Sequence, residues 1–258
     1  MMLSTTRNNL LLRAKGAGKI AVSLLFWCAL WGVLAVLLGK PVLLPTPWAV
    51  VRRLGSLAVT AEYWKSVAFS FLRIFTGYVL GCACGILLAF LCARFGAVRV
   101  LFQPFLSVVR SVPVSSFIIL ALVWIGRENV PIFIAFLMVL PIVVGNLCEG
   151  FGQIDIQLAE VAKVYRFGVW KTFRYVTLPA LLPFFVSAAQ TSLGLAWKAG
   201  VAAEVLCSLS ASIGGQIYAS KLYLDTESLF AWTVTVILIS MLIEKLIFAK
   251  KKKEGKRP

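Results

Sequence analysis

The chain has 258 residues, of which 60% are hydrophobic and 14% charged, and its net charge is +16. About a quarter of the residues of an ordinary soluble domain are charged, so this composition excludes that class and indicates an integral membrane protein. The positive charge does not predict a nucleic-acid partner, because the Lys and Arg residues stand at the ends of apolar runs and form no basic face interleaved with aromatic residues.

The residue types give little support to catalytic or metal chemistry. The chain has no histidine, which removes the commonest general base and metal ligand. Its six cysteines lie in or beside apolar runs without the spacing of a metal or redox site, so we expect small buried hydrophobic side chains there. We therefore predict a protein that is not an enzyme and that binds no metal or cofactor itself.

Six apolar runs are long enough to cross the hydrocarbon core of a membrane as helices. They cover about residues 20–39, 65–92, 101–125, 130–149, 179–206 and 227–248. The first run is too long for the apolar part of a signal peptide and is followed by no small-x-small cleavage site, so we expect an uncleaved anchor. The prediction is an all-α membrane protein with a single transmembrane domain over residues 1–258.

The basic residues that flank these runs predict the orientation, because cytoplasmic loops collect Lys and Arg. With the N-terminus inside, the cytoplasmic segments contain Arg7, Arg13, Lys15, Lys19, Arg94, Arg99, Lys163, Arg166, Lys171, Arg174, Lys245, Lys250 to Lys253, Lys256 and Arg257. The outer segments contain Lys40, Arg52, Arg53, Lys65, Arg127 and Lys221. Both termini are therefore predicted to be cytoplasmic.

Between the first two runs, the stretch LLPTPWAVVRRLGSLAVTAEYW begins with Pro and Thr start signals and continues with apolar residues at helical spacing. We predict a short amphipathic helix on the outer surface. Such a helix either caps the external mouth of the protein or rests on the lipid, and we favour the second.

The second run carries Gly77, Gly81 and Gly85 at four-residue spacing, which lets helices approach closely. The glycines fit either close packing within one subunit or a contact between two subunits. We favour packing within the subunit.

A polar and basic segment, LAEVAKVYRFGVWKTFRYVTLP, separates the fourth and fifth runs. Residues 158–165 favour helix, Gly168 interrupts that helix, and Pro179 opens the fifth run as a tolerated first-turn proline. We expect a short helix, a bend and a second short helix at the cytoplasmic surface, in a loop covering residues 150–178.

This segment resembles the cytoplasmic signature of the permease subunits of bacterial ATP-binding-cassette importers. That signature begins Glu-Ala-Ala, places a Gly four residues after the second Ala, and ends in Ile-x-Leu-Pro. The matching positions are Glu160, Ala162, Val176, Leu178 and Pro179, whereas Val161 replaces the first Ala and Arg166 stands at the Gly position, with Gly168 two residues later. The resemblance implies that these residues form a coupling helix and its flanks, which dock on a separate ATPase subunit.

The resemblance extends over most of the chain. Stretches such as SFLRIFTGYVLGCACGILLAF and LGLAWKAGVAAEVL look like the branch of these permeases that carries nitrate, sulfonate, taurine and bicarbonate, and that also includes carriers of thiamine-pyrimidine precursors. It implies alternating access in the plasma (inner) membrane, a second permease subunit in a homodimer, and an extracytoplasmic solute-binding protein. ATP and Mg would be bound by the partner ATPase subunit.

Four charged residues fall inside the predicted spans, where ionisable groups are costly and usually mark pathways or internal pairs. They are Arg73, Arg110, Lys198 and Glu204. The two arginines either favour an anionic solute in transit, pair with a carboxylate, or extend to the membrane boundary. Lys198 and Glu204 are six residues apart and do not share a helix face closely, which leaves an interhelical pair or a gate contact for each.

Three rival interpretations fit less well. The chain is not an ATPase itself, because GAGKI at residues 16–20 lacks the first Gly and the final Ser or Thr of a phosphate-binding loop. A secondary transporter of a small solute is the alternative function, but it predicts inverted repeats or broken helices near the membrane midplane, and the chain shows no convincing internal symmetry. An intramembrane enzyme would need a recognisable arrangement of catalytic residues, which the sequence lacks.

Overall fold

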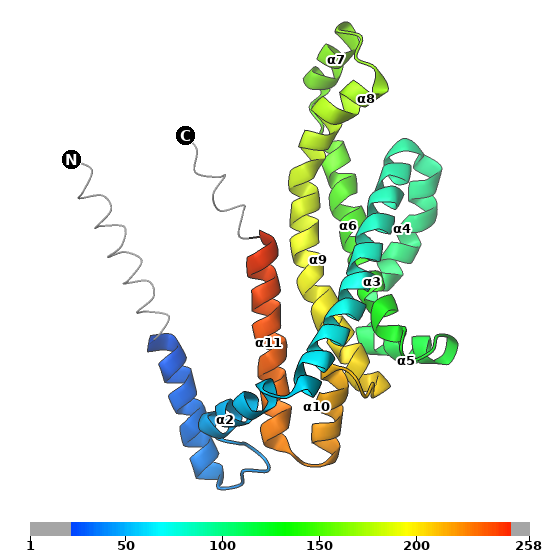
Figure 1. Ribbon diagram of the computed structural model, residues 1–258. Coiled ribbons are helices and arrows are strands. Elements are labelled where there is room, and N and C mark those ends of the chain that lie inside the picture. The colour runs from blue at the N-terminus through cyan, green and yellow to red at the C-terminus, as the bar shows by residue number, and fades with distance from the viewer. Residues whose placement is uncertain (1–21, 249–258) are drawn as a thin grey trace, which may run out of the picture.

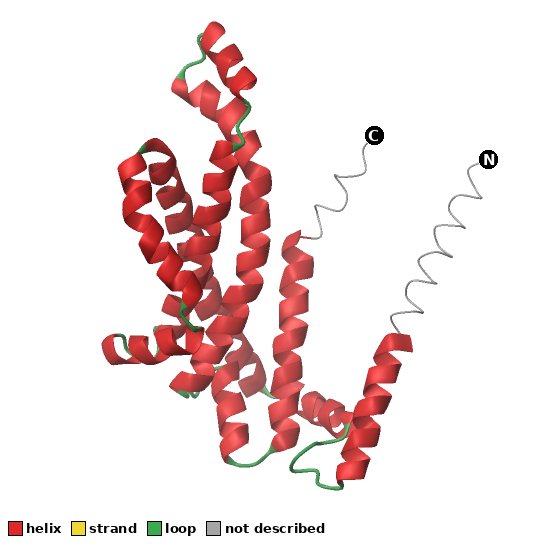
Figure 2. Cartoon of the chain, turned by 180° about the vertical axis from the view of Figure 1, so that it is seen from behind, coloured by secondary structure: helices red, strands yellow, loops and turns green. Residues whose placement is uncertain are grey.

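The computed structural model describes residues 22–248, and every regular element among them is a helix (Figures 1 and 2). In chain order these are the helix Val22–Leu38, α2 (Pro47–Ala58), α3 (Ala61–Arg94), α4 (Gly96–Ser111), α5 (Val114–Trp124), α6 (Val130–Gly152), α7 (Ile156–Val164), α8 (Val169–Thr172), a π-helix (Phe173–Thr177), α9 (Leu178–Cys207), α10 (Ile213–Leu222) and α11 (Thr226–Phe248). The all-α prediction is confirmed for this part of the chain. The start of the predicted span 20–39 and the terminal basic residues, except Lys245, lie outside it.

Four helical stretches of the described chain are long and apolar enough to cross a membrane: α3, α6, α11 and the continuous path from α8 to the end of α9. A fifth crossing results if the bent pair α4 and α5 counts as one span. The remaining predicted span corresponds to the shorter apolar helix Val22–Leu38. The predicted spans thus coincide with helices, and the structure supports four or five of them as membrane crossings.

The third predicted span, 101–125, is not one straight helix. α4 ends at Ser111, α5 begins at Val114, and their axes differ by 109°. Pro113 has no N–H to donate, and a residue before proline avoids helical geometry. Val112 accordingly has an extended backbone with ψ 134°. The apolar run continues across this break, which is why hydrophobicity alone predicted a single span.

The centre of the bundle is formed by α3, α6 and α9, which pack against one another. These three helices supply most residues of the main hydrophobic core. Gly77, Gly81 and Gly85 face α6 at its closest approach to α3: a Cβ on Gly81 would lie 2.7 Å from the Cβ of Val139, and one on Gly85 would lie 2.8 Å from the Cβ of Val143. The glycines therefore pack within the subunit, as favoured from the sequence.

The predicted amphipathic helix before the second span forms as α2 and packs against α11. Thr46 caps its N-terminus, and Arg53 donates to Asp225 and Ser228 at the start of α11. The helix Val22–Leu38 stands beside α11 and contacts it through the rings of Trp31 and Phe230, whose centroids are 5.6 Å apart (Figure 1). The contacts of Arg53 thus hold α2 against the start of α11, so that α2 does not depend on lipid alone for its position.

The segment between α6 and α9 extends beyond the rest of the bundle (Figure 1). We call residues 156–177, which include α7, α8 and the π-helix, the α7 arm. The opposite end of the bundle, around α2, α10 and the start of α11, is called the α10 end. The described start of the helix Val22–Leu38 and the described end of α11 point toward the side of the α7 arm (Figures 1 and 2).

Candidate functional site

The α7 arm begins with a well-formed helix start. Asp155 is the N-cap of α7, and its carboxylate accepts a hydrogen bond of 2.8 Å from the backbone N–H of Gln157. This bond satisfies one of the N–H groups that a helix start leaves without a partner. The predicted short helix is therefore present, over residues 156–164.

α7 ends at Val164, and the chain bends at Arg166 and not at Gly168, which corrects the position of the bend predicted from the sequence. Arg166 has φ 51°, in the left-handed region that glycine usually occupies. The backbone N–H of Phe167 donates to Ala162 at 2.8 Å, and that of Arg166 donates to Lys163 at 3.0 Å. These paired bonds form the usual glycine-type helix stop. Gly168 instead has φ −66° and begins α8.

The arm joins α9 through an irregular turn. The π-helix Phe173–Thr177 precedes Pro179, which stands in the first turn of α9 as predicted. A proline removes one backbone donor, and such irregular turns accompany it where a helix must continue. Val176 is half-buried in this turn, whereas Leu178 and Pro179 are exposed.

The α7 arm exposes many large apolar side chains among its charged ones. Ala162 is 3% exposed and is the one position of the arm classed as buried among those whose side chains are described. Glu160 is exposed, and Val161 is 48% exposed beside it. Other large apolar side chains exposed on the arm are Ile156, Leu158, Val164, Tyr165, Val169, Trp170 and Tyr175. Exposed apolar groups gathered on one projecting segment mark a contact either with another protein or with the membrane.

A second cluster of predicted residues lies toward the α10 end, where α3, α9 and α10 meet. Glu204 is fully buried, and its Oε2 accepts a hydrogen bond of 2.7 Å from the Ser70 hydroxyl and one of 3.2 Å from the backbone N–H of Gly214. The Ser70 hydroxyl in turn accepts from the backbone N–H of Ile213 at 2.8 Å. These bonds fasten the start of α10 to α3 and α9.

Arg73, one turn along α3 from Ser70, completes this cluster. Its guanidinium donates to the Glu128 carboxylate at 2.7 Å and to the Ala211 carbonyl at 3.1 Å. Arg73 therefore ties the loop after α5 to the loop before α10. Of the alternatives left open for this arginine, the structure shows the pair with a carboxylate.

The other two charged residues of the spans lie apart from this cluster. Lys198 is exposed on α9 and has no ion pair with any residue in 22–248. Arg110 lies near the end of α4 and donates to the backbone carbonyl of Pro141 in α6. The structure thus brings Arg73 and Glu204 together and leaves Arg110 and Lys198 at separate places.

Several residues of these sites were not predicted. Ser70 and Gly214 were missed because they are separated from each other and from Glu204 along the chain, so no local pattern indicates their contact. A cavity beside Arg110 is also lined by Arg99, Gln103 and Ser107. These residues could have been predicted, because polar residues recur at helical spacing in this part of the sequence. Within residues 22–248, no group of three His, Cys, Asp or Glu residues is placed to hold a metal ion.

Comparison with known proteins gives consistent matches. A family model described as the binding-protein-dependent transport system inner membrane component matches residues 84–249. A probable ABC transporter permease protein of Brucella melitensis is 30% identical over 209 residues, which is 81% of this chain and 85% of that protein. The putative aliphatic sulfonates transport permease protein SsuC of Bacillus subtilis is 27% identical, covering 90% of this chain and 83% of its own length. The taurine transport system permease protein TauC of Escherichia coli is 26% identical, covering 88% and 83%.

A solved structure is also similar. It shows inward-facing conformations of the MetNI methionine ABC transporter, and one of its chains matches with a TM-score of 0.54 at 18% identity, covering 83% of this chain and 99% of that one. At this identity the likeness concerns the fold alone.

Proposed function

The chain belongs to the family of binding-protein-dependent transport system inner membrane components, and from this premise we propose that it moves a small solute inward by alternating access, driven by a separate ATPase. It is a multi-pass permease of the inner membrane and a transport component, not an enzyme. The particular solute, the membrane topology and the docking residues form the proposal.

The α7 arm is the observation that carries this proposal. It projects from the ends of α6 and α9 (Figure 1), and it exposes apolar side chains beside Glu160. Leaving such side chains in water is unfavourable, by about 25 cal/mol for each Å² of apolar surface. We infer that an ATPase subunit covers this surface, with Glu160 and Val161 at its centre and Ala162 packed beneath them. The flank of the surface is formed by Arg166, Gly168, Val176, Leu178 and Pro179.

The helices on either side of the arm provide the route for motion. α6 and α9 leave the arm directly and pack against each other and against α3. A rigid-body movement of a docked ATPase would therefore move the two long helices together. This is the mechanical requirement for coupling ATP hydrolysis, carried out with Mg on the partner, to a change of access.

The proposed topology has six crossings with both termini in the cytoplasm. It is supported by the common direction of the described chain ends and the α7 arm (Figure 2) and by the basic residues near them. The helix Val22–Leu38 would be the first crossing and the bent pair α4 and α5 the third. The α10 end would then face outward, where a solute-binding protein delivers its cargo.

The cargo that fits best is a small oxyanion such as a sulfonate or taurine, the substances named for two of the relatives. A thiamine-pyrimidine precursor is the other candidate from the sequence. We further propose that two copies of the chain form the permease as a homodimer, with the pathway between them.

The experiment is ATP hydrolysis in proteoliposomes that contain this chain and its candidate ATPase, with and without a binding protein loaded with taurine, nitrate, an alkylsulfonate or a thiamine-pyrimidine precursor. Stimulation by one loaded binding protein would support the importer and identify the solute. If the purified chain does not retain an ATPase subunit, the docking proposal fails.

A further inference from the structure

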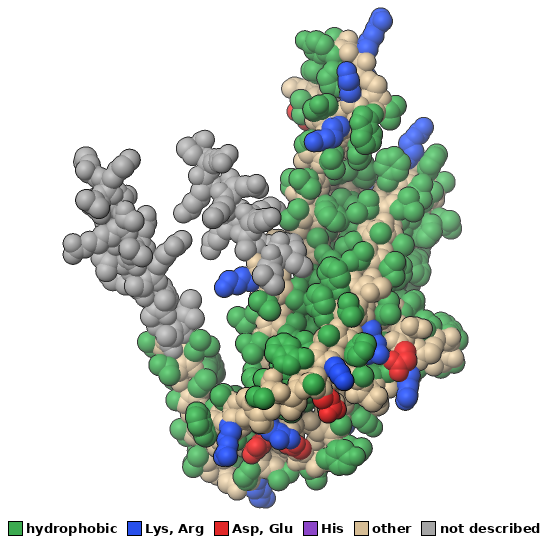
Figure 3. Space-filling model, in the orientation of Figure 1, with side chains coloured by type: hydrophobic (Ala, Val, Ile, Leu, Met, Phe, Trp, Pro, Cys, Tyr) green, Lys and Arg blue, Asp and Glu red, His purple; other side chains and the backbone are tan. Residues whose placement is uncertain are grey.

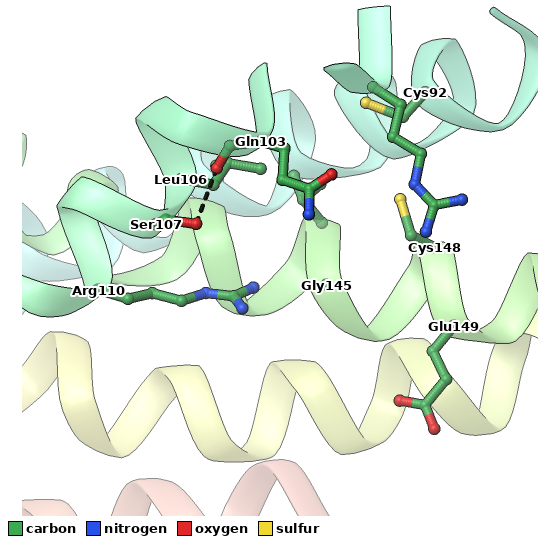
Figure 4. Close-up of a pocket in the computed structure, with 10 residues that line it drawn as sticks. Cys92, Gln103, Leu106, Ser107, Arg110, Gly145, Cys148 and Glu149 are labelled. Atoms are coloured by element: carbon green, nitrogen blue, oxygen red, sulfur yellow. Dashed lines mark hydrogen bonds between the residues drawn. The ribbon is translucent and has the colours of Figure 1, made fainter. Parts of the chain in front are cut away.

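A polar cavity of about 430 Å³ lies between α4 and α6 near the end of α3 (Figure 4). Its lining residues are Cys92, Arg99, Gln103, Leu106, Ser107, Arg110, Val144, Gly145, Cys148 and Glu149. The volume is within the range of small-molecule sites, roughly 300–1,000 Å³. The cavity is separate from both the α7 arm and the Glu204 cluster.

The cavity carries more positive than negative charge. Arg99 and Arg110 line it, and neither forms an ion pair with any residue of the described chain. Glu149 is the one acidic side chain among the lining residues, and it is not within ion-pair distance of either arginine. The pair of guanidinium groups is therefore available to an anion.

Gly145 gives Arg110 its position in this cavity. The Arg110 guanidinium lies against the backbone of α6, where one of its nitrogens donates to the Pro141 carbonyl. A Cβ at position 145 would meet this guanidinium. The small residue therefore allows the arginine to rest on α6 (Figure 4). One nitrogen is engaged with Pro141, which leaves the other donors of the guanidinium for a ligand.

The polar lining of α4 forms one row along that helix. Arg99, Gln103, Ser107 and Arg110 follow at spacings of three and four residues, which place them on one helix face. At 1.5 Å per residue the row is about 16 Å long, roughly half of the ~30 Å hydrocarbon core. In the proposed topology it runs from the cytoplasmic end of α4 toward the break at Val112.

We propose that this cavity binds a small oxyanion, of the sulfonate or carbonate type, on its way to the cytoplasm. The two guanidinium groups supply planar pairs of donors that match such an anion, and the Gln103 amide adds uncharged donors. Unpaired arginines facing only lipid would be costly, whereas a hydrated cavity that receives anions satisfies them. The inference rests on the proposed transport function and specifies its substrate class and the residues that meet it.

The native cysteine in the cavity permits a direct test. The chain is prepared with Cys148 as its single cysteine, the other five replaced by Ala, in phosphatidylcholine nanodiscs without an ATPase. Modification of Cys148 is timed with a sulfonate-bearing and a trimethylammonium-bearing methanethiosulfonate, each rate divided by the rate on a free thiol in solution. We expect the normalised rate of Cys148 modification to be about tenfold higher for the anionic reagent than for the cationic one. Methanesulfonate should slow both reactions.

Two variants show whether the arginines cause this preference. Arg99→Gln together with Arg110→Gln should abolish it, whereas the control Arg94→Gln, which removes one charge outside the cavity lining, should retain it. Gel filtration checks that each variant remains monodisperse, and Arg110→Lys, which keeps the charge, serves as a second variant if the double change does not fold. An equal rate for both reagents, or a preference that survives the double change, would overturn the proposal.

A phospholipid headgroup offers the same chemistry as a free oxyanion. The measurement is therefore repeated in nanodiscs that contain phosphatidylglycerol. If phosphatidylglycerol slows the modification of Cys148 and methanesulfonate does not, the cavity binds a lipid headgroup. That result would overturn the proposal that it binds a transported oxyanion. Because no ATPase is present, this result is independent of the proteoliposome experiment: stimulated ATP hydrolysis with no anion preference at Cys148 would reject this inference and leave the importer intact.

Discussion

At the α10 end of the bundle, two pairs of oppositely charged side chains form ion pairs, whereas at the α7 end the charged side chains stand without ion pairs among residues 22–248. The two ion pairs of the described chain, Arg53 with Asp225 and Arg73 with Glu128, both lie at the α10 end, where Figure 3 shows acidic and basic side chains together. On the α7 arm the basic side chains are Lys163, Arg166, Lys171 and Arg174, and none has an acidic side chain within ion-pair distance in that part of the chain.

The contrast in ion pairing shows which end of the bundle is held together by contacts within one chain. Hydrogen bonds and ion pairs at the α10 end connect α2 to the start of α11, and α10 to α3 and α9. The α7 end presents its charges and its apolar side chains outward. We interpret the first end as fastened by its own residues, so that it presents a preformed face to the solute-binding protein. The second end is a surface whose charges and apolar groups are left for the ATPase and the transported anion in our proposals.

The largest effect is expected from breaking the contact at the α7 end. Glu160→Lys reverses a charge at the centre of the proposed docking surface, and coupled uptake in proteoliposomes should fall at least tenfold. Membrane insertion should be unaffected because Glu160 is exposed. Glu160→Gln, which keeps the size of the side chain, separates the role of the charge from that of the shape. Wild-type uptake by the Lys variant would contradict the assignment.

The next effect tests the fastening at the α10 end. Glu204→Ala leaves the Ser70 hydroxyl and the Gly214 N–H without their buried partner, and each such loss costs about 1–3 kcal/mol. We expect a fall of several degrees in the apparent melting temperature of the purified chain, followed by intrinsic Trp fluorescence.

The matched control at this position is Glu204→Gln, whose side-chain oxygen can still accept both hydrogen bonds. It should lose much less stability than the Ala variant. Equal melting temperatures for the Ala variant and the wild type would show that these bonds do not hold α10 in place.

A smaller effect, of opposite sign, is expected from Arg166→Gly. The left-handed backbone at Arg166 costs a non-glycine residue roughly 1 kcal/mol, and glycine removes this cost. The arm should become slightly more stable, with coupled uptake preserved, as measured by slower proteolysis within residues 156–177. Faster proteolysis would show that the Arg side chain itself stabilises the bend.

The smallest effect concerns pH and the tie between α2 and α11. Partial burial raises the pKa of the Asp225 carboxyl. Hydrogen bonds from Ser228 and the charge of Arg53 lower it by more than burial raises it, so the pKa lies below its usual value of 3.8. The stabilisation is therefore present at neutral pH and is lost as the pH falls through the lowered pKa. Because the side chains of Arg53 and Asp225 are both about 40% exposed, we expect their ion pair to contribute under 1 kcal/mol to the free energy of unfolding.

The measurement for this last prediction is the melting temperature of Asp225→Asn against the wild type across a pH series. The difference should be present at pH 7, should begin to shrink as the pH falls below the usual pKa of aspartate, and should vanish once the pH is below the lowered pKa of Asp225. A constant difference at all pH values would show that the charge of Asp225 does not contribute. Arg53→Gln should give the same pH dependence.

The helices of the long apolar runs could be predicted because their composition requires a membrane or a buried core. The break at Pro113 was missed although the Val-Pro pair carried the signal, because the apolar run masked it. The bend of the α7 arm was expected at Gly168 but lies at Arg166, since helix-stop hydrogen bonds held a non-glycine residue in the left-handed region. The contact between Ser70 and Glu204 joins residues 134 positions apart, and only the packing of α3 against α9 creates it.

The seam between α3 and α6 has a consequence for how this chain tolerates changes of length. Gly77, Gly81 and Gly85 meet α6 in register, and a helix turns by about 100° for each residue. One inserted or deleted residue between Gly77 and Gly85 would rotate part of this row away from α6 and place a larger side chain in the contact. We expect length variation among functional relatives to avoid this segment and to collect in the loops at either end of the bundle.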